Sequence, residues 1–554
     1  MTQRDDSRLF SFFRWIAETS ETHTRWYLAA IVLLAALLRI PALGTVPQGF
    51  HFDEAVVGYD AYCILHTGAD HYGDRLPVLA RTFNGYNEAL NRYITAVSIS
   101  ILGLNVAAVR LPFALSGVLS ILVIYFFALE LYRNKQIALF VAFTLAVSPW
   151  HIHYTRTTFA AMLLPMLVAL GSASVLKARK DSKYLAIAGI AFGLSLFTYM
   201  SARGFVPLFV FGLLIVYWSD LRRYHRQIAI GAVIFISALF FISSFWFSSL
   251  ETGRWGQTKT GSLAAWGFGY WNSYSPILFF RLPNEYSQIF DLVSPGLSLL
   301  HSYELIVIPI GVVYIIRTWQ HEYWLLLIWL ILYPFPAFMT MGGSEHVLRL
   351  SNGVIITASL SGYGLWRVFV WLQNRSSKRG IVVFTACIVV ILLTNCNIYV
   401  NKRNDYNATL SKWQYGFERA ISVSSGLSHH KIFISANVTG AYILTLFFSK
   451  HLPNAAQVVM QSVALPEAGL IHNIPNISFG RYNIRPAELL FEESLSEKGN
   501  VIIATLEDIN DMAVDQFETI ERIDYPNGEP ALYVLKSKGG REEVPQNSRV
   551  RDDI

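Results

Sequence analysis

Long apolar runs alternate with short polar connections along the first 400 residues. A helix that crosses a bilayer needs about 20 predominantly apolar residues, and runs of this kind recur at regular intervals. The pattern predicts about eleven membrane-spanning helices, at about 26–43, 109–131, 137–153, 158–176, 184–200, 204–219, 228–247, 303–317, 323–340, 350–371 and 381–399. We therefore expect residues 26–400 to form a polytopic α-helical membrane module.

Two long segments interrupt this alternation, at about 45–107 and 248–300. The first is too polar to cross a membrane and too rich in aromatic residues to be a free loop, and it carries several carboxylates. We expect it to form amphipathic helices that lie in the membrane interface. The second segment is rich in glycine, tryptophan, tyrosine and serine.

From about residue 401 the pattern changes to short apolar stretches of strand length between amphipathic ones. Strands are expected at 431–435, 500–505 and 531–536, and helices at 413–423 and 441–450. This alternation predicts a small α/β domain over 401–536. Residues 1–25 form a polar N-terminal arm and 537–554 a polar tail.

The distribution of charged residues predicts how the chain is oriented in the membrane. Only 15% of residues are charged and 53% are hydrophobic, whereas soluble proteins carry roughly 25% charged residues. The net charge of +6 resides in short loops between apolar runs, as the positive-inside rule requires of cytoplasmic loops, and we expect no nucleic-acid partner. Eleven spans then place the N-terminus in the cytoplasm and the C-terminal domain outside a plasma (inner) membrane.

The acidic stretch at residues 51–60 follows the first apolar run directly. Carboxylates beside a bilayer are costly unless they are solvated, paired or used in chemistry. We interpret Asp53 as a catalytic base and assign Glu54 and Glu88 to the catalytic group with it. The alternatives are that Asp53 and Glu54 cap an interfacial helix, and that Glu88 forms an ordinary helical ion pair with Arg92.

Cations on the same expected side are few, and a bound phosphate needs fixed cations. Candidates for such a phosphate site are Arg349, His346, Arg156 and Arg203. Snorkelling at the interface is the alternative for Arg349, and Arg110 is expected to mark the membrane edge.

His151 and His153 have the alternate spacing that a metal could use, but no third ligand is in view. We favour an aromatic interface belt at these positions. No metal site or cofactor is therefore assigned, although a divalent cation stays open.

The order of motifs resembles a known superfamily. Its landmarks are the Asp53-Glu54 pair, the stretch 84–88, the Arg110-Leu111-Pro112 opening of the second span and Ser148-Pro149-Trp150. This order is similar to that of the protein O-mannosyltransferase and aminoarabinose transferase superfamily, glycosyltransferases of the GT-C fold. The resemblance covers about 1–400 and is strongest in the first 160 residues.

The resemblance implies inverting transfer of a monosaccharide from a polyprenyl-phosphate donor, without a nucleotide sugar, to a protein, lipid or glycan acceptor on the outer face. Asp53 matches the family's general base or acceptor anchor, and Glu88 matches a second acid that helps to bind acceptor or sugar. In the aminoarabinose branch Lys-Pro follows that acid, whereas Ala89-Leu90 follows here. The phosphate contact of that lysine must then come from elsewhere.

We assign Tyr59, Asp60 and Asn87 to acceptor binding, with a solvated or helix-pairing role as the alternative for Asp60. Two other functions stay open. One is a ligase that moves a longer glycan from a polyprenyl carrier, and the other is a transporter or lipid flippase without chemistry. Transporters often show paired halves, and no such internal repeat is visible in this sequence.

Overall fold

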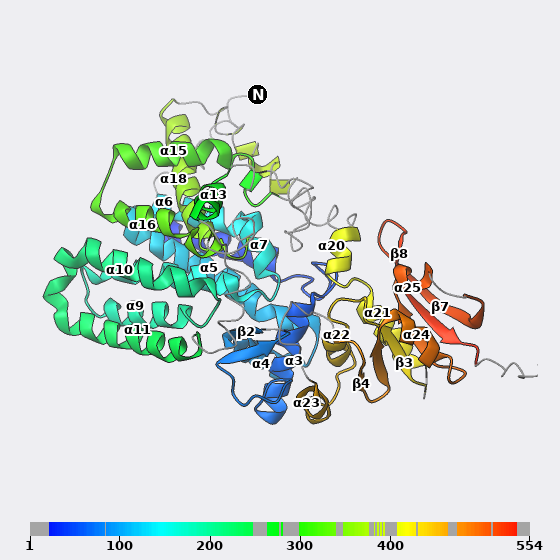
Figure 1. Ribbon diagram of the computed structural model, residues 1–554. Coiled ribbons are helices and arrows are strands. Elements are labelled where there is room, and N and C mark those ends of the chain that lie inside the picture. Colours follow the sequence, from blue (N-terminus) through cyan, green and yellow to red (C-terminus); the bar gives the residue numbers. More distant parts are fainter. Residues whose placement is uncertain are drawn as a thin grey trace, which may run out of the picture.

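The computed structural model describes residues 21–83, 85–246, 263–275, 279–280, 298–338, 347–375, 407–427, 430–463, 474–510 and 514–539, and a few positions between 380 and 393. Helices dominate the part before residue 380, and a six-stranded sheet with its helices forms the C-terminal part (Figure 1). The eleventh expected span, 381–399, lies largely outside the described residues.

Each of the first ten expected spans contains a helix or a broken helix. The helices are α2 (Glu21–Arg39), α5 (Val106–Tyr132), α6 (Lys135–Val147) with α7 (Pro149–Thr155), α8 (Leu163–Ala178), α9 (Tyr184–Ser195), α10 (Ser201–Leu221), α11 (His225–Trp246), α15 (Glu304–Arg317), α16 (Trp324–Leu332) with α17 (Phe335–Phe338), and α18 (Gly353–Asn374). By length and hydropathy alone, four described helical segments could cross a membrane, or five if the bent pair α6–α7 is one span. Several helices are shorter than the expected spans.

Polar caps divide the apolar sequence into separate helices. Arg133 ends α5 in the left-handed conformation, and the Asn134 side chain accepts hydrogen bonds from the first amides of α6. Ser148 and Pro149 then end α6 and begin α7, with a bend of 56° between the two axes. These short turns are what let consecutive helices pack side by side.

Small residues let two helices approach closely in the membrane part. A Cβ at Gly364 of α18 would clash with the Val307 carbonyl oxygen of α15, and one at Gly311 would clash with the Leu360 carbonyl oxygen. Backbone contact of this kind is typical of membrane helix pairs, where small residues permit the approach.

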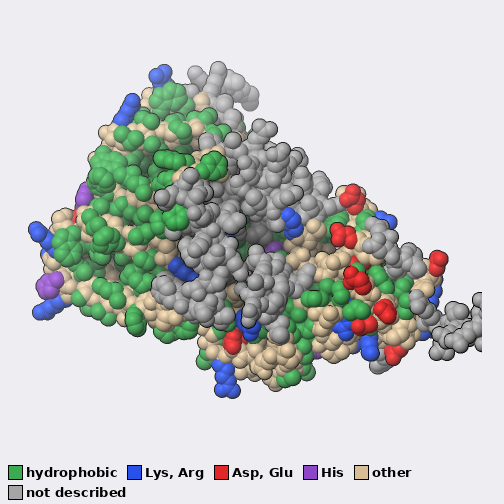
Figure 2. All heavy atoms as spheres, in the orientation of Figure 1, with side chains coloured by type: hydrophobic (Ala, Val, Ile, Leu, Met, Phe, Trp, Pro, Cys, Tyr) green, Lys and Arg blue, Asp and Glu red, His purple; other side chains and the backbone are tan. Residues whose placement is uncertain are grey.

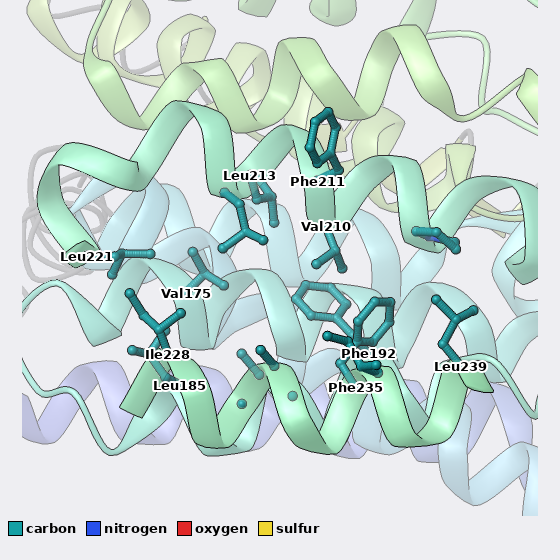
Figure 3. A pocket seen from close by; sticks show the side chains of 17 residues that line it. Val175, Leu185, Phe192, Val210, Phe211, Leu213, Leu221, Ile228, Phe235 and Leu239 are labelled. Carbon is teal, nitrogen blue, oxygen red and sulfur yellow. The ribbon is translucent and has the colours of Figure 1, made fainter. Parts of the chain in front are cut away.

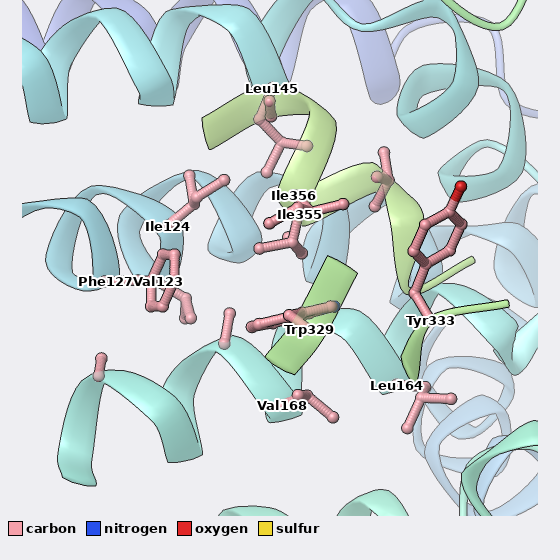
Figure 4. Close-up of a cluster of buried hydrophobic side chains, with 14 of the residues drawn as sticks. Val123, Ile124, Phe127, Leu145, Leu164, Val168, Trp329, Tyr333, Ile355 and Ile356 are labelled. Carbon is pink, nitrogen blue, oxygen red and sulfur yellow. The ribbon is translucent and has the colours of Figure 1, made fainter. Parts of the chain in front are cut away.

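Helices α9 and α11 also pack closely, whereas an apolar cleft separates α10 from α11 (Figure 3). Buried side chains of these three helices belong to the same hydrophobic core as those of α5, α6, α8, α16 and α18. Trp329 of α16 is fully buried among side chains such as Val168 and Ile355, and its indole nitrogen donates to the Asn352 carbonyl (3.0 Å; Figure 4).

The first outer segment is more varied than the expected interfacial helices. It contains α3 (Phe52–Thr67), an antiparallel hairpin of β1 (Leu79–Thr82) and β2 (Gly85–Glu88), and α4 (Leu90–Leu102). The hairpin was not expected, because its strands are only four residues long. It brings Glu88 opposite Leu79 and places it just before α4.

The C-terminal part forms a sheet with strand order β4-β5-β3-β6-β8-β7. Its strands are β3 (Ile432–Ser435), β4 (Ile477–Phe479), β5 (Tyr482–Arg485), β6 (Val501–Ala504), β7 (Phe517–Asp524) and β8 (Pro530–Ser537). Only β3 pairs in parallel, with β5 and β6. Strands β3, β6 and β8 match the three expected strands, while β4, β5 and β7 are additional.

Six short helices accompany this sheet: α20 (Asn407–Lys412), α21 (Phe417–Gly426), α22 (Ala441–Phe448), α23 (Pro453–Ser462), α24 (Ala487–Ser494) and α25 (Leu506–Asn510). The two expected helices correspond to α21 and α22. Figure 2 shows acidic side chains over this part of the molecule, whereas hydrophobic side chains cover the visible face of the membrane part.

The C-terminal part shares a hydrophobic core with the first outer segment. This core joins Tyr59 of α3 and Val109 of α5 to Ile443 and Phe447 of α22. A Cβ at Gly58 would lie 2.7 Å from atoms of both Val109 and Phe447, so α3 and α22 are in direct contact (Figure 1). The sheet is thus fixed against the segment that carries the candidate acids.

Candidate active site

Asp53 lies in the first turn of α3, where its carboxylate remains open to solvent. The N-cap residue is His51, whose Nδ1 accepts a hydrogen bond from the Asp53 amide (3.2 Å). The same Nδ1 lies 3.5 Å from Oδ2 of Asp53, and the Asp53 side chain is 47% exposed. The positive end of the helix dipole favours the ionised carboxylate at this position.

Glu54 has the opposite environment, although it is the next residue. Its side chain is fully buried and its two oxygens accept from Nε and Nη2 of Arg110, at 3.0 and 2.7 Å. Oε1 also accepts from the amide and hydroxyl of Thr158, each at 3.0 Å, and Oε2 accepts from the His51 amide. Glu54 therefore completes a capping box and ties three segments together, with no oxygen at the surface.

Arg110, which the sequence predicts at the membrane edge, has a structural role that was not expected. It is fully buried, and besides binding Glu54 its Nη atoms donate to the carbonyls of Leu43, Pro47 and Gly49. A buried guanidinium requires an ionic partner and several acceptors. Here the chain between the first span and α3 wraps around it and supplies them.

Asp60 is also buried and paired, which differs from the expected contact with an acceptor. Oδ1 accepts from the amide and Nδ1 of His71, at 3.1 and 2.5 Å, and Oδ2 accepts from Nε of Arg92 at 2.9 Å. Burial alone would raise the pKa of Asp60, but His71 and Arg92 hold that pKa below its ordinary value. This ion-paired cluster corresponds to the helix-pairing alternative.

The remaining two acceptor candidates lie in different environments. Tyr59 is fully buried, and its hydroxyl donates to the His451 carbonyl of the C-terminal part (2.8 Å), so it holds two parts of the fold together. Asn87 is half-buried in β2, opposite Ala80 of β1. Only Asn87 of these two retains an accessible side chain.

Glu88 and Arg203 are brought together across 115 positions of sequence. Nε and Nη2 of Arg203 donate to Oε1 of Glu88, at 3.1 and 2.9 Å. The Glu88 side chain is 2% exposed and that of Arg203 18%. Arg92 does not pair with the Glu88 carboxylate; it donates to the Glu88 carbonyl and forms its ion pair with Asp60. The acid and the cation expected at the site thus form one unit.

The hairpin that carries Glu88 contacts the beginning of α3. The rings of Phe52 and Phe83 meet edge to face with centroids 5.2 Å apart. Phe52 immediately precedes Asp53, and Phe83 directly follows β1 in the turn of the hairpin. Asp53 and the Glu88–Arg203 pair therefore belong to one packed region.

The other residues expected to bind the phosphate lie in different environments. Arg156 is buried, and its Nη atoms donate to the carbonyls of Leu38, Pro41 and Val46 at 2.8 to 3.0 Å, so those atoms face the backbone instead of a ligand. Arg349 is partly buried just before α18. His346 lies outside the described residues.

Arg39 is a buried cation that the sequence reasoning did not single out. Its Nη2 lies 2.8 Å from Nδ1 of His151, and its Nη1 donates to the Ala146 carbonyl at 2.8 Å. His151 thus contacts a guanidinium, which does not fit a metal ligand. The sequence could have identified Arg39, because it is an arginine inside the first apolar run and such a charge needs a buried partner.

Trp413 is a second residue that sequence reasoning missed. It is fully buried, its carbonyl accepts from the Phe50 amide (2.7 Å), and its ring contacts those of His51 and Phe159. A Cβ on Gly49 would clash with the Trp413 backbone, and Gly49 has a positive φ of 79°. The C-terminal part therefore contributes to the wall beside Asp53.

Within the described residues, no group of three or more His, Cys, Asp or Glu side chains could hold a metal ion. The local chemistry of the site is instead one accessible carboxylate, a paired acid and cation, and a shell of aromatic side chains. Such a set can accept a proton and bind an anion.

Comparison with known proteins gives a consistent assignment. Residues 90–247 match the family model described as dolichyl-phosphate-mannose-protein mannosyltransferase. No curated protein matches the chain by sequence.

Two solved structures share the fold over most of the chain. The apo crystal structure of ArnT from Cupriavidus metallidurans is 12% identical, with a TM-score of 0.53 over 95% of this chain and 98% of that chain. The archaeal oligosaccharyltransferase AglB from Archaeoglobus fulgidus, in complex with an inhibitory peptide and a dolichol-phosphate, is 12% identical, with a TM-score of 0.50 over 95% and 75%.

The family model covers the helices α4 to α11, which follow the acidic segment. Together these findings show that the chain has the GT-C fold of these two structures, and that residues 90–247 are similar to the mannosyltransferase family.

Proposed function

We propose that this protein is an inverting membrane glycosyltransferase that moves a monosaccharide from a polyprenyl-phosphate donor to a hydroxyl acceptor on the outer face of the membrane. The observation that carries the proposal is the contrast within α3. Asp53 is accessible, whereas the two other acids of that helix, Glu54 and Asp60, are buried and ion-paired. One free carboxylate on a rigid, buried support is what a general base requires.

In the proposed reaction, Asp53 accepts the proton of the acceptor hydroxyl while its oxygen attacks the anomeric carbon. The new carbon–oxygen bond forms on one face of the sugar as the bond to the phosphate oxygen breaks on the other, which inverts the configuration. Polyprenyl phosphate leaves with the electron pair of that bond. Asp53 then returns the proton to solvent, to which it is open.

The pair Glu88–Arg203 is the proposed contact for the charged and hydroxylated part of the donor. The Arg203 side chain is 18% exposed beside Glu88, and its planar guanidinium suits a phosphate. Arg349, near the start of α18, is a second proposed cation for the phosphate. Neither role requires Arg156, whose Nη atoms bind backbone carbonyls.

Glu54 and Arg110 are proposed as positioning residues and not as reacting groups. Their bidentate pair is inaccessible, and through the His51 amide it fixes the first turn of α3, where Asp53 lies. A base that is held in one orientation loses less entropy in the transition state than a mobile one.

The proposal can be tested with Asp53→Asn in the purified full-length enzyme, assayed with a polyprenyl-phosphate sugar and a panel of hydroxyl acceptors. We expect transfer to fall by about 10²- to 10⁴-fold, the usual contribution of a general base. The matched control is Asp74→Asn, an exposed acid in the same outer segment, which should leave the rate unchanged.

Full activity in Asp53→Asn would remove this residue from the mechanism. The same assay separates the two alternatives. A flippase would move labelled lipid between leaflets without releasing polyprenyl phosphate, and a glycan ligase would transfer a chain of sugars and leave single sugars on their carrier.

A further inference from the structure

An apolar cleft lies between two consecutive helices of the membrane part. α10 and α11 run in opposite directions and are joined by the tight turn η2 (Arg222–Tyr224), while α8 and α9 close the back of the cleft (Figure 3). Its volume is about 310 Å³, which falls in the range of small-ligand pockets, roughly 300 to 1,000 Å³.

The lining is hydrocarbon along the whole length of the cleft. The lining residues on α10 extend from Pro207 to Leu221, and none of the 17 lining residues is charged or carries a hydroxyl. Fourteen residues of helix span about 21 Å. A sugar or a headgroup in this space would leave its polar atoms without partners, so a long, flexible hydrocarbon chain is the ligand that fits.

One end of the cleft is basic. The end that Leu221 and Ile228 line lies at the α10–α11 turn, where Arg222, Arg223 and Arg226 are exposed. Figure 2 shows Lys, Arg and His side chains together at the tip of the molecule where Figure 1 places this turn.

The positive charge at the turn is not neutralised by nearby acids. In the described part of the chain, Arg222 and Arg226 form no ion pair with a carboxylate, and Arg223 donates to the Arg179 carbonyl (2.7 Å). Arg179 itself is paired, with Asp220 at 2.6 Å and Glu322 at 2.7 Å. The turn thus presents an excess of cationic donors beside the entrance to an apolar space.

We propose that this cleft is a binding site for an anionic phospholipid of the leaflet opposite the catalytic segment. One acyl chain lies between α10 and α11, and the phosphate of the headgroup binds Arg222 and Arg226. The positive-inside rule accounts for arginines in such a loop. It does not account for their position at the end of a cleft of acyl-chain shape, and basic pockets between spans are typical sites for anionic headgroups.

The site is distinct from that of the proposed sugar donor. Arg203, the proposed donor ligand, lies at the other end of α10, one turn before Pro207. A headgroup at the α10–α11 turn is therefore separated from Arg203 by nearly the whole length of the helix, about 27 Å. The phospholipid would stabilise the packing of α10 without taking part in transfer.

The test uses native mass spectrometry of the purified full-length protein, incubated with equimolar dioleoyl-phosphatidylglycerol and dioleoyl-phosphatidylcholine. We expect preferential retention of phosphatidylglycerol, and a loss of affinity on the order of tenfold in the double variant Arg222→Gln/Arg226→Gln. The matched control is Arg317→Gln/Arg375→Gln, two exposed arginines at the ends of α15 and α18, which should retain the lipid as before.

A second pair of variants tests the acyl-chain cleft. Ala232→Phe fills the lining of the cleft, whereas Ala229→Phe adds the same bulk to an exposed position on α11 outside it. We expect only the first to lose the lipid. If Ala232→Phe lowers the Tm in the absence of lipid, Leu214→Trp, at a more exposed lining position, takes its place.

Three outcomes would overturn the proposal. They are equal retention of the two lipids, equal retention by the Ala232 and Ala229 variants, and displacement of phosphatidylglycerol by equimolar polyprenyl phosphate, which would assign the cleft to the donor. Because retention is measured without turnover, the result does not depend on the proposed transferase activity.

Discussion

At the scale of single residues, neighbouring acids have different roles because their surroundings differ. Asp53 and Glu54 are adjacent in sequence, yet one is open to solvent and the other is buried in a bidentate ion pair. A helix turns about 100° per residue, so adjacent side chains face different directions. Asp53 therefore faces outward while Glu54 faces the core.

Removing the charge of Glu54 should destabilise the fold. Glu54→Gln leaves the Arg110 guanidinium buried without an anionic partner, and breaking a buried pair from one side typically costs about 3–5 kcal/mol. We expect a clearly lower Tm in thermal unfolding of the purified protein. Asp53→Asn, at an accessible position, should unfold like the unmodified protein, and an unchanged Tm for Glu54→Gln would contradict the positioning role.

Asp70 should make stability depend on pH. Its Oδ1 accepts from the amides of Tyr72 and Asp74, but its buried Oδ2 has no partner among the described residues. Burial, and next the Asp60 carboxylate, raise the pKa of Asp70 to about 6. The folded protein therefore holds this proton more tightly than the unfolded chain, whose carboxyl has a pKa near 3.9.

This difference in proton binding determines how the stability of the folded protein changes with pH. The contribution of Asp70 to stability is full below about pH 4 and is lost as the pH rises through about 6. Asp70→Asn keeps the Oδ1 acceptor and removes the buried charge, so it should raise the unfolding free energy by on the order of 2–3 kcal/mol at pH 8 and by less at pH 5.

The measurement is the Tm of both proteins at these two pH values, with Glu507→Gln, at an exposed position of the C-terminal part, as the control. An equal effect of Asp70→Asn at pH 5 and pH 8 would show that the carboxyl titrates normally.

At the scale of elements, the hydrophobic pattern predicts helices well and their pairing poorly. The first ten expected spans coincide with helices. The three expected strands of the C-terminal part coincide with β3, β6 and β8. The hairpin β1–β2 and strands β4, β5 and β7 were missed. Four of these five strands have no more than four residues, and a run that short carries little periodicity.

The contact between α3 and α22 provides a test at this scale. Gly58→Ala places a methyl group 2.7 Å from atoms of Val109 and Phe447, so the three elements must move apart. Overpacking of this kind typically costs about 1–3 kcal/mol. We expect a lower Tm and faster proteolysis of the C-terminal part.

The double variant Gly58→Ala/Phe447→Leu gives the internal control. The smaller leucine makes room for the added methyl group. Phe447→Leu should therefore lower the free energy of unfolding by less in the Gly58→Ala background than in the unmodified protein. Additive losses would show that the two side chains do not compete for the same space.

At the scale of the whole molecule, the C-terminal part is joined to the acidic segment by a common core. Both must lie on the same side of the membrane, and from the basic turns at the other end of the helices we propose that this is the outer side. A tag inserted after residue 540 should then be labelled on intact cells. Labelling that requires permeabilised cells would reverse the proposed topology.

The sequence by itself determined the helical membrane architecture and the α/β nature of the C-terminal part, and it predicted the candidate site around Asp53. These features depend on local patterns of apolar residues and on motif order, which survive without knowledge of contacts. The resemblance recognised in those motifs agrees with the family-model match over residues 90–247 and with the fold shared with ArnT.

Only the tertiary structure decided which charged residues remain available. Glu54 pairs with Arg110 across 56 positions, Glu88 with Arg203 across 115, and Arg39 meets His151 across 112. A buried charge must find a partner or several acceptors, and folding brings that partner from a distant segment. Sequence spacing cannot reveal such a pairing, because the helices that supply the two residues meet only when they pack.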